Sequence, residues 1–192
     1  MKSWEALPDS VLRRGGIVSR AFAAAGVPDY RSAARYVRDL AYERNLDRGD
    51  CLSVLRERRG TCSTKHALLA RLAAEQELPV DLAIGIYEMN GRNTPGVGDV
   101  LARYGLSAIP EAHCYLIYAG DRVDVTRNVD AAEPISRFLH EQRISPDQIG
   151  EYKIALHQDF IRNWLAHTGS DQALGFDQIW KIREECIAAL SE

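Results

Sequence analysis

One cysteine in this sequence stands where a thiol makes a good nucleophile. Cys62 lies in the run GTCST (60–64), in which Thr61 or Ser63 can cap a helix that continues to about Glu77. A helix N-terminus lowers the pKa of a thiol, because its backbone N–H groups and dipole favour the anion. The alternative is a buried structural cysteine. The glycine two residues earlier, the polar neighbours and the position at a helix start favour a nucleophile.

A cysteine nucleophile needs a base, and the base needs a third group to orient it. His113 precedes the apolar run 114–118, and strand alternation puts His113 and Tyr115 on one face and Cys114 on the other. Asp124 lies between two valines on the next expected strand, where a carboxylate is costly without a partner. We therefore expect His113 to be the base and Asp124 its orienting acid, with Tyr115 as a candidate cleft-lining residue.

The turn between these two strands leaves a second candidate for the orienting residue. If Gly120 and Asp121 form a two-residue loop, Asp124 lies four positions from His113 along the strand, roughly 13 Å at about 3.3 Å per residue. Asn128 then lies opposite His113, and Cys–His–Asn sites occur in papain-like enzymes. A bulge or a wider loop would bring Asp124 back within reach. Asp124 and Asn128 both remain open as the residue that orients the histidine.

His66 lies four residues after Cys62 and therefore on the same helical face. These two residues and His113 can be considered as zinc ligands, but no CxxC or HxxxH pair supports a closed metal site. We expect no metal and no cofactor, and we expect His66 to line the cleft or to support Cys62. The oxyanion hole is expected to use the Cys62 backbone N–H and a second donor that the sequence does not identify.

The elements that must position these residues fall into three parts: a helical part, a mixed part and a second helical part. Helical spacing of apolar residues, strand-like runs and turn residues define their bounds. The fold class is therefore α+β, with helices at both ends of the chain around a small antiparallel β-sheet. The expected elements are helices from Asp9 to about Leu55, a helix to about Glu77, strands at 80–87, 112–118 and 122–126, a long loop at 90–110, and helices from Glu133 to Glu192.

Composition limits what the chain can be. Its 192 residues predict a single domain over 1–192, and an apolar share of 46% with 27% charged residues is typical of a globular protein. A net charge of −3 provides no basic field for nucleic acid or a membrane surface. The sequence shows neither a secretory signal nor a long apolar run, and its four cysteines show no CxxC spacing. We therefore expect a cytoplasmic protein with free thiols.

Two segments of the sequence carry a resemblance to a known family. GTCSTKHALLARLAAEQELPV and EAHCYLIYAGDRVDVT, in that order, resemble the segments of the transglutaminase-like superfamily in which Gly-x-Cys opens a helix, His begins a strand and Asp-x-Thr lies on the next. The resemblance covers roughly Leu52 to Arg127 and leaves the two helical ends unexplained. It implies a papain-like fold and Cys–His–Asp chemistry carried by Cys62, His113 and Asp124.

Two classes of function follow from these residues. The first is cysteine-dependent acyl transfer or hydrolysis on an amide through a thioester, with a peptide, a protein side-chain amide or a small amide as substrate. The sequence does not separate a peptidase or amidase from a transglutaminase, and an arylamine acetyltransferase uses the same three residue types. The second class is a non-catalytic binding or scaffold module on the same fold.

Overall fold

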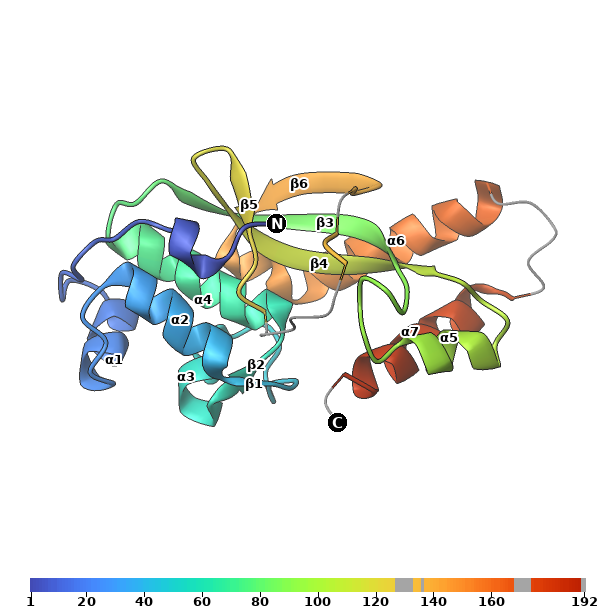
Figure 1. Ribbon diagram of the computed structural model, residues 1–192, viewed down its shortest axis with the longest axis horizontal. Helices are drawn as coiled ribbons and strands as arrows, with labels where there is room; N and C mark the ends of the chain where they lie inside the picture. The colour runs from blue at the N-terminus through green and yellow to red at the C-terminus, as the bar shows by residue number, and fades with distance from the viewer. Residues whose placement is uncertain (127–132, 136, 168–173, 191–192) are drawn as a thin grey trace. The chain divides into compact units, whose positions relative to one another are not determined.

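A computed structural model describes residues 1–126, 133–135, 137–167 and 174–190 of the chain. Helices and a small sheet both occur, so the chain is α+β, as the sequence predicts (Figure 1). The main sheet has the strand order β5-β4-β3-β6, and a separate parallel pair joins β1 to β2. The elements are η1 (Trp4–Ala6), α1 (Ile17–Ala24), α2 (Tyr30–Asp39), β1 (Ala41–Tyr42), α3 (Ser53–Glu57), β2 (Arg59–Gly60), α4 (Cys62–Glu75), β3 (Val80–Met89), α5 (Gly98–Arg103), β4 (Ile109–Tyr118), β5 (Asp121–Val123), β6 (His140–Ile144), η2 (Pro146–Ile149), α6 (Glu151–His167) and α7 (Phe176–Ala188).

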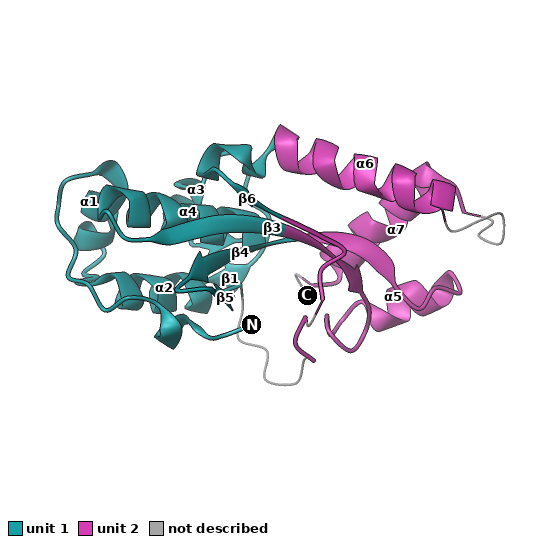
Figure 2. Ribbon diagram, turned by 90° about the horizontal axis from the view of Figure 1, so that it is seen from above, with its two compact units in different colours: residues 1–84, 113–128, 142–150 teal, residues 85–112, 129–141, 151–192 magenta. Residues whose placement is uncertain are grey.

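The chain divides into two compact units, coloured separately in Figure 2. Unit 1 comprises residues 1–84, 113–128 and 142–150, and unit 2 comprises residues 85–112, 129–141 and 151–192. The boundaries fall within β3, β4 and β6. A division into compact units does not test whether each unit folds alone, so the single domain over 1–192 stays a prediction.

Helix α4 is the centre of unit 1. It is buried on nearly all sides and packs against α1 and α2 (Figure 1). A helix that is apolar all round belongs in a core, and here Ala and Leu supply most of the buried surface. The hydroxyl of Tyr30 in α2 donates to the backbone oxygen of Leu69 in α4 at 3.0 Å. The nucleophile candidate therefore lies at the start of a helix that is buried within its unit.

The first helix begins later than the sequence indicates. The expected helix from Asp9 is wrong, because α1 begins at Ile17. The side chain of Glu75, at the end of α4, accepts the backbone N–H groups of Val18 and Ser19 at 2.9 and 2.7 Å. A carboxylate at a helix start satisfies N–H groups that have no partner within the helix. The local Gly15-Gly16 pair, with Gly16 as the N-cap, and the distant Glu75 carboxylate together set this helix boundary.

The hairpin between β4 and β5 turns one residue earlier than the sequence analysis assumed. Tyr118 pairs with Asp121, so the two-residue loop is Ala119-Gly120 and not Gly120-Asp121. Both loop residues have positive φ, 51° at Ala119 and 84° at Gly120, as a type I′ turn requires. The turn was misplaced because alanine rarely adopts this conformation. Correcting it moves Asp124 two positions closer to the start of β4.

Besides the short elements η1, β1, β2 and η2, helix α5 and strand β6 are absent from the sequence prediction. Helix α5 lies inside the expected loop 90–110, where Val100 and Leu101 are buried in the core of unit 2. Strand β6 lies where helix was expected after Glu133, at the edge of the sheet beside β3. The first is too short and the second, HEQRI, too polar to give a periodic apolar pattern. Both depend on packing partners that are distant in the sequence.

Unit 2 has an apolar core and a buried ion pair between Glu111 and Arg183. Residues of β3, β4, α5, α6 and α7 form the core, with Ile161, Ile179 and Ile182 at most 1% exposed. Glu111 of β4 accepts two hydrogen bonds from Arg183 of α7, both at 2.8 Å. A bidentate pair of this kind satisfies two charges that would be costly to bury separately. This pair therefore ties α7 to the strand that continues toward His113.

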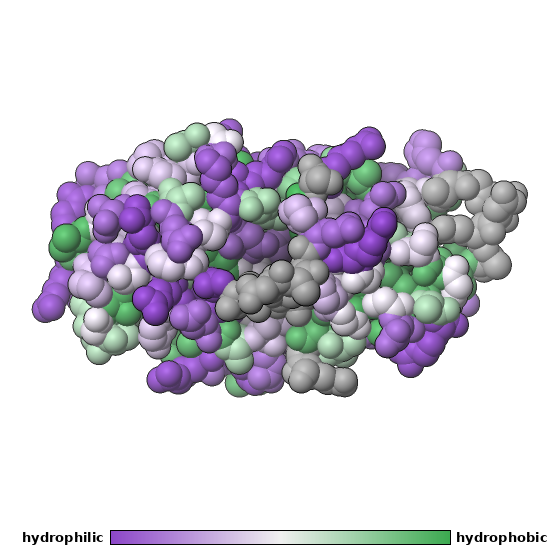
Figure 3. Space-filling view, in the orientation of Figure 1, coloured by the Kyte–Doolittle hydropathy of each residue, from purple (hydrophilic) through white to green (hydrophobic). Residues whose placement is uncertain are grey.

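Figure 3 shows hydrophilic residues over much of the visible face, with hydrophobic residues interspersed among them. Within the described ranges, no helix has both the length and the apolar character that crossing a membrane requires.

Candidate active site

Cys62 is the first residue of α4, as the sequence predicts. Thr61 precedes it in an extended conformation, with φ −93° and ψ 178°, which confirms Thr61 as the helix cap position. The cysteine is 8% exposed, and its sulfur lies 3.8 Å from the Ser63 hydroxyl. The backbone N–H groups of the first helical turn point toward this end of α4, where they favour a thiolate.

The glycine two residues before the cysteine is required by close packing. A Cβ atom at Gly60 would lie 2.9 Å from the Thr64 hydroxyl oxygen and 3.0 Å from both Lys65 Cγ and Val54 Cγ2. Side chains do not approach so closely without displacement of a neighbour. Gly60 therefore allows β2 to lie directly against the first turn of α4.

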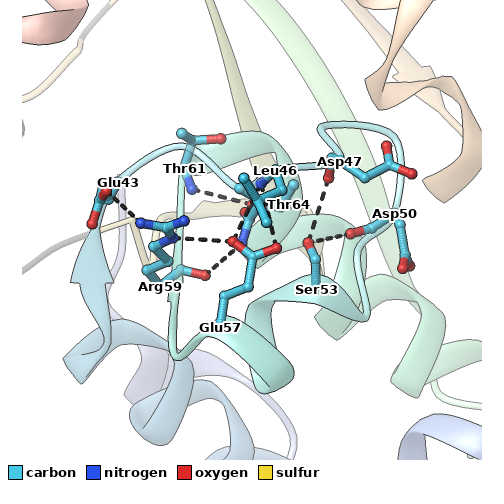
Figure 4. Close-up of polar contacts among 10 residues, drawn as sticks. Glu43, Leu46, Asp47, Asp50, Ser53, Glu57, Arg59, Thr61 and Thr64 are labelled. Carbon is cyan, nitrogen blue, oxygen red and sulfur yellow. Dashed lines mark hydrogen bonds and ion pairs between the residues drawn. The ribbon is translucent and has the colours of Figure 1, made fainter.

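A network of polar contacts holds the segment that leads into the nucleophile (Figure 4). The Thr64 hydroxyl accepts the Thr61 N–H at 3.1 Å and donates to the Asn45 side-chain oxygen at 2.7 Å. The Asn45 amide in turn donates to the backbone oxygen of Arg59 at 3.0 Å, and Arg59 donates through Nε to Glu57, also at 3.0 Å. These bonds fix the backbone at Arg59 and at Thr61, shortly before Cys62 in the chain.

His113 and Asp124 come together in a direct hydrogen bond. His113 Nε2 lies 2.8 Å from Asp124 Oδ2. The hairpin register, with Leu116 opposite Val123, puts Asp124 diagonally across from His113. The Cys62 side chain also hydrogen-bonds His113 and raises the pKa of its imidazole. The structure thus joins the three residues in the expected order.

The second orienting candidate of the sequence analysis, Asn128, lies outside the described residues. The reason for proposing it was a register that the structure corrects. With the observed turn, the acid reaches the histidine by the diagonal and no bulge is needed.

The electrostatics of the pair favour a charged histidine. Burial disfavours the imidazolium, but the Asp124 carboxylate and the hydrogen bonds to Asp124 and Cys62 raise the pKa of His113 to about 10. Burial would also raise the pKa of Asp124, but the charge and hydrogen bond of His113 hold it well below its usual range. At neutral pH the site therefore contains an ionised acid, an imidazolium and a sulfur in contact with that imidazolium.

Thr126 belongs to the site, although the sequence analysis did not assign it a role. Its backbone N–H and its hydroxyl donate to Asp124 Oδ1 at 2.8 and 2.6 Å. The two carboxylate oxygens are thus divided, one facing Thr126 and the other facing His113. The spacing Asp-x-Thr was the available signal, since such side chains commonly bond to the backbone two residues later.

His66 supports the site from within and does not line an open surface. It is completely buried, with Nδ1 2.8 Å from the Cys62 backbone oxygen and Nε2 accepting the Val125 N–H at 2.9 Å. An acceptor at Nε2 leaves the proton on Nδ1, so the ring is neutral. Burial lowers its pKa to about 4, although the carboxylate of Asp124 lies 3.5 Å from Nε2. His66 is therefore not the base that ionises Cys62.

Lys65 is a second residue that the sequence analysis missed. It is completely buried, and its ammonium donates to the backbone oxygens of Leu40 at 2.6 Å, Thr126 at 2.8 Å and Arg38 at 3.4 Å. Burial lowers its pKa to about 8, which keeps most of it charged at neutral pH. The available signal was a Lys-His pair on the same helical face as Cys62 in a helix otherwise rich in Ala and Leu.

The remaining candidate residues are buried. Tyr115 is fully buried, and its ring stacks on His113 with centroids 6.2 Å apart. Cys51, Cys114 and Cys186 are also buried, and burial raises the pKa of the Cys51 and Cys186 thiols. In the part of the chain that the structure describes, no group of His, Cys, Asp or Glu side chains has the arrangement of a metal site.

Comparison of the chain with protein-family models, with curated proteins and with solved structures finds no match.

Proposed function

We propose that this protein is a cysteine-dependent enzyme that cleaves or transfers acyl groups of amides through a thioester on Cys62. The observation that carries the proposal is the connected series Cys62, His113 and Asp124, in which His113 contacts the sulfur and lies 2.8 Å from the acid. A nucleophile, a base and an orienting acid in this arrangement are the parts that acyl transfer needs. We further propose a papain-like, transglutaminase-like fold, on the strength of the order and placement of these three residues.

The first chemical step forms the thioester. The Cys62 thiolate attacks the amide carbonyl carbon, and the C=O electron pair moves onto oxygen. The Cys62 backbone N–H, at the positive end of α4, is one donor that can stabilise this oxyanion. As the tetrahedral intermediate collapses, the C–N bond breaks and His113 passes a proton to the leaving nitrogen, so an amine or ammonia departs.

The second step regenerates the thiolate. Neutral His113 removes a proton from water or from an incoming amine, which attacks the thioester carbonyl, and the C–S bond breaks. Water yields a carboxylic acid, and an amine yields a new amide. Asp124 keeps its charge throughout, because its role is to hold the imidazole orientation and to stabilise the imidazolium.

The proposed substrates are peptides, protein side-chain amides or small amides, and no cofactor takes part in the proposed reaction. The buried free thiols fit a reducing compartment, so we propose a cytoplasmic location.

The test uses a small activated ester, p-nitrophenyl acetate, as acyl donor. Acetyl transfer breaks the ester C–O bond, releases p-nitrophenolate and leaves an acetyl thioester on one cysteine. Mass spectrometry of the digested protein should place the acetyl group on Cys62, and added hydroxylamine should remove it. Cys62→Ala should abolish the burst of p-nitrophenolate.

The matched control is Cys114→Ala, which removes a buried thiol next to the histidine in the sequence. This variant should keep the burst, because Cys114 lies on the opposite face of β4 from His113. A non-catalytic scaffold on the same fold would show no burst, and its Cys62 would acetylate no faster than a free thiol in solution. That result would overturn the proposed activity.

A further inference from the structure

The segment that carries the acid lies beyond the β4–β5 pairing, and its first backbone N–H, that of Asp124, donates to the Lys2 oxygen at 3.2 Å. Strand β5 ends at Val123, so Asp124, Val125 and Thr126 continue beyond the last pair of the hairpin register. A catalytic carboxylate must keep its position within a fraction of an ångström, and a segment outside the ladder needs other partners for its backbone.

The partners of the next two residues come from the helix of the nucleophile. His66 Nε2 accepts the Val125 N–H at 2.9 Å, and Lys65 Nζ donates to the Thr126 backbone oxygen at 2.8 Å. Lys65 and His66 follow Cys62 by three and four residues, so all three side chains project from one face of α4. The helix that presents the sulfur thus also holds two backbone groups just after Asp124, the Val125 N–H and the Thr126 oxygen.

The two residues differ in what else they bind. His66 donates from Nδ1 to the Cys62 carbonyl at 2.8 Å, so one ring contacts the nucleophile residue and the segment of the acid. Lys65 also donates to Leu40 at 2.6 Å, which joins the end of α2 to the same segment. Both side chains are fully buried, and their polar atoms form hydrogen bonds with other groups of the protein.

We propose that Lys65 and His66 are positioning residues, which fix the segment 124–126 to α4 and thereby hold the Asp124 carboxylate against His113. The inference rests on the proposed function, because it concerns the geometry of the same site. It assigns no contact with substrate to either residue. His66 acts through Val125, and Lys65 acts through Thr126.

The two nitrogens of His66 permit a matched test. The Cys62 carbonyl already belongs to the helical hydrogen-bond pattern, whereas the Val125 N–H depends on His66. In His66→Gln the side-chain amide oxygen can reach the former Nε2 position and accept the Val125 N–H. In His66→Asn the shorter amide reaches only the Nδ1 position, so the contact with Cys62 is kept and the contact with Val125 is lost.

The readout is the rate at which iodoacetamide alkylates Cys62, measured against pH by mass spectrometry. We expect His66→Asn to lower the rate at neutral pH by about 10- to 100-fold, since small displacements of catalytic groups have effects of this size. The rate should also fall again at high pH, where His113 loses its proton, and this upper pH limit of fast alkylation is called the alkaline limit. In His66→Asn the alkaline limit should move to lower pH as Asp124 moves away. His66→Gln should restore most of the rate and return the alkaline limit toward that of the wild type.

Lys65→Met provides an independent variant, because it keeps the aliphatic stem and removes the three donors. It should also lower the alkylation rate and shift the alkaline limit. His157→Gln serves as the control: His157 is a buried histidine of unit 2 that bonds the Pro110 oxygen at 2.9 Å. It should leave both readouts unchanged, even if its melting temperature falls.

The outcomes separate this inference from the proposed function. Wild-type Cys62 that reacts no faster than a free thiol would overturn the proposed function, and the positioning roles with it. A fast wild-type thiol, together with wild-type rates and alkaline limits in folded His66→Asn and Lys65→Met, would overturn the positioning roles alone. Equal losses in His66→Gln and His66→Asn would refute the assignment of the critical contact to Val125.

Discussion

Replacing Asp124 with asparagine tests the electrostatic basis of the site. The folded protein raises the pKa of His113 from 6.5 to about 10. At about 1.36 kcal/mol per pKa unit, the folded environment favours the imidazolium by roughly 5 kcal/mol. Asparagine keeps the shape of the acid and an oxygen for one of its partners but removes the charge. The pKa of His113 should fall by about 1 to 3 units or more, because burial then opposes the imidazolium with less compensation.

The assay follows alkylation of Cys62 against pH, together with NMR titration of the His113 ring. In Asp124→Asn the alkaline limit of alkylation should move to lower pH, the rate at neutral pH should fall, and turnover of an acyl donor should drop by up to about 10⁴-fold. Asn128→Ala should remain close to the wild type, because the acid already occupies His113 Nε2. A working Asp124→Asn beside an inactive Asn128→Ala would refute the assignment of the orienting residue.

The same pair predicts the pH dependence of stability. The folded pKa of His113 lies above 6.5, so its contribution is complete below pH 6.5 and is lost as the pH rises toward about 10. The folded pKa of Asp124 lies below 3.8, so the contribution is also lost as acid protonates the carboxylate. In Asp124→Asn the fall in unfolding free energy between neutral and alkaline pH should be smaller than in the wild type. An identical fall in both proteins would show that the pair does not hold the imidazolium.

Three further results are expected. Gly60→Ala should lower the unfolding free energy by about 1–3 kcal/mol in urea titrations and slow the alkylation of Cys62, because its Cβ would press on the first turn of α4. Gly15→Ala is the control and should have neither effect, because nothing lies within 4 Å of the added carbon. Arg183→Met should lower the unfolding free energy by about 3–5 kcal/mol, because it leaves Glu111 charged and buried. Adding Glu111→Leu should recover part of that loss. A small loss in the single variant would contradict the importance of the buried pair. Cys114→Ala should keep the acyl-transfer burst, and an inactive but folded Cys114→Ala would mean that the faces of β4 are assigned wrongly.

The sequence was sufficient for the parts of the site that depend on local chemistry. A capping residue before Cys62, a histidine next to an apolar run and a carboxylate between valines all follow from neighbouring residues, although β4 begins at Ile109 and not at the histidine. The α+β class follows in the same way from periodic segments that are long enough to recognise.

The remainder depends on contacts between distant residues. The hairpin register was wrong because Ala119 adopts a positive φ, which sequence preference disfavours, and the reason for considering Asn128 depended on that register. The contacts of Lys65 with Thr126 and of His66 with Val125 were missed because these partners lie 61 and 59 residues away along the chain, whereas support of Cys62 by His66 was expected. Strand β6 was missed because an edge strand need not show an apolar face.

The most direct test of a catalytic site at Cys62 compares the alkylation of all four cysteines in the native protein. Iodoacetamide at neutral pH, followed by digestion and mass spectrometry, gives a rate for each thiol relative to a free cysteine. A thiolate stabilised by His113 should react far faster than the free thiol, whereas Cys51, Cys114 and Cys186 should react more slowly because they are buried. If Cys62 reacts no faster than the free thiol while His113 and Asp124 are intact, the site does not activate a nucleophile and the account is wrong.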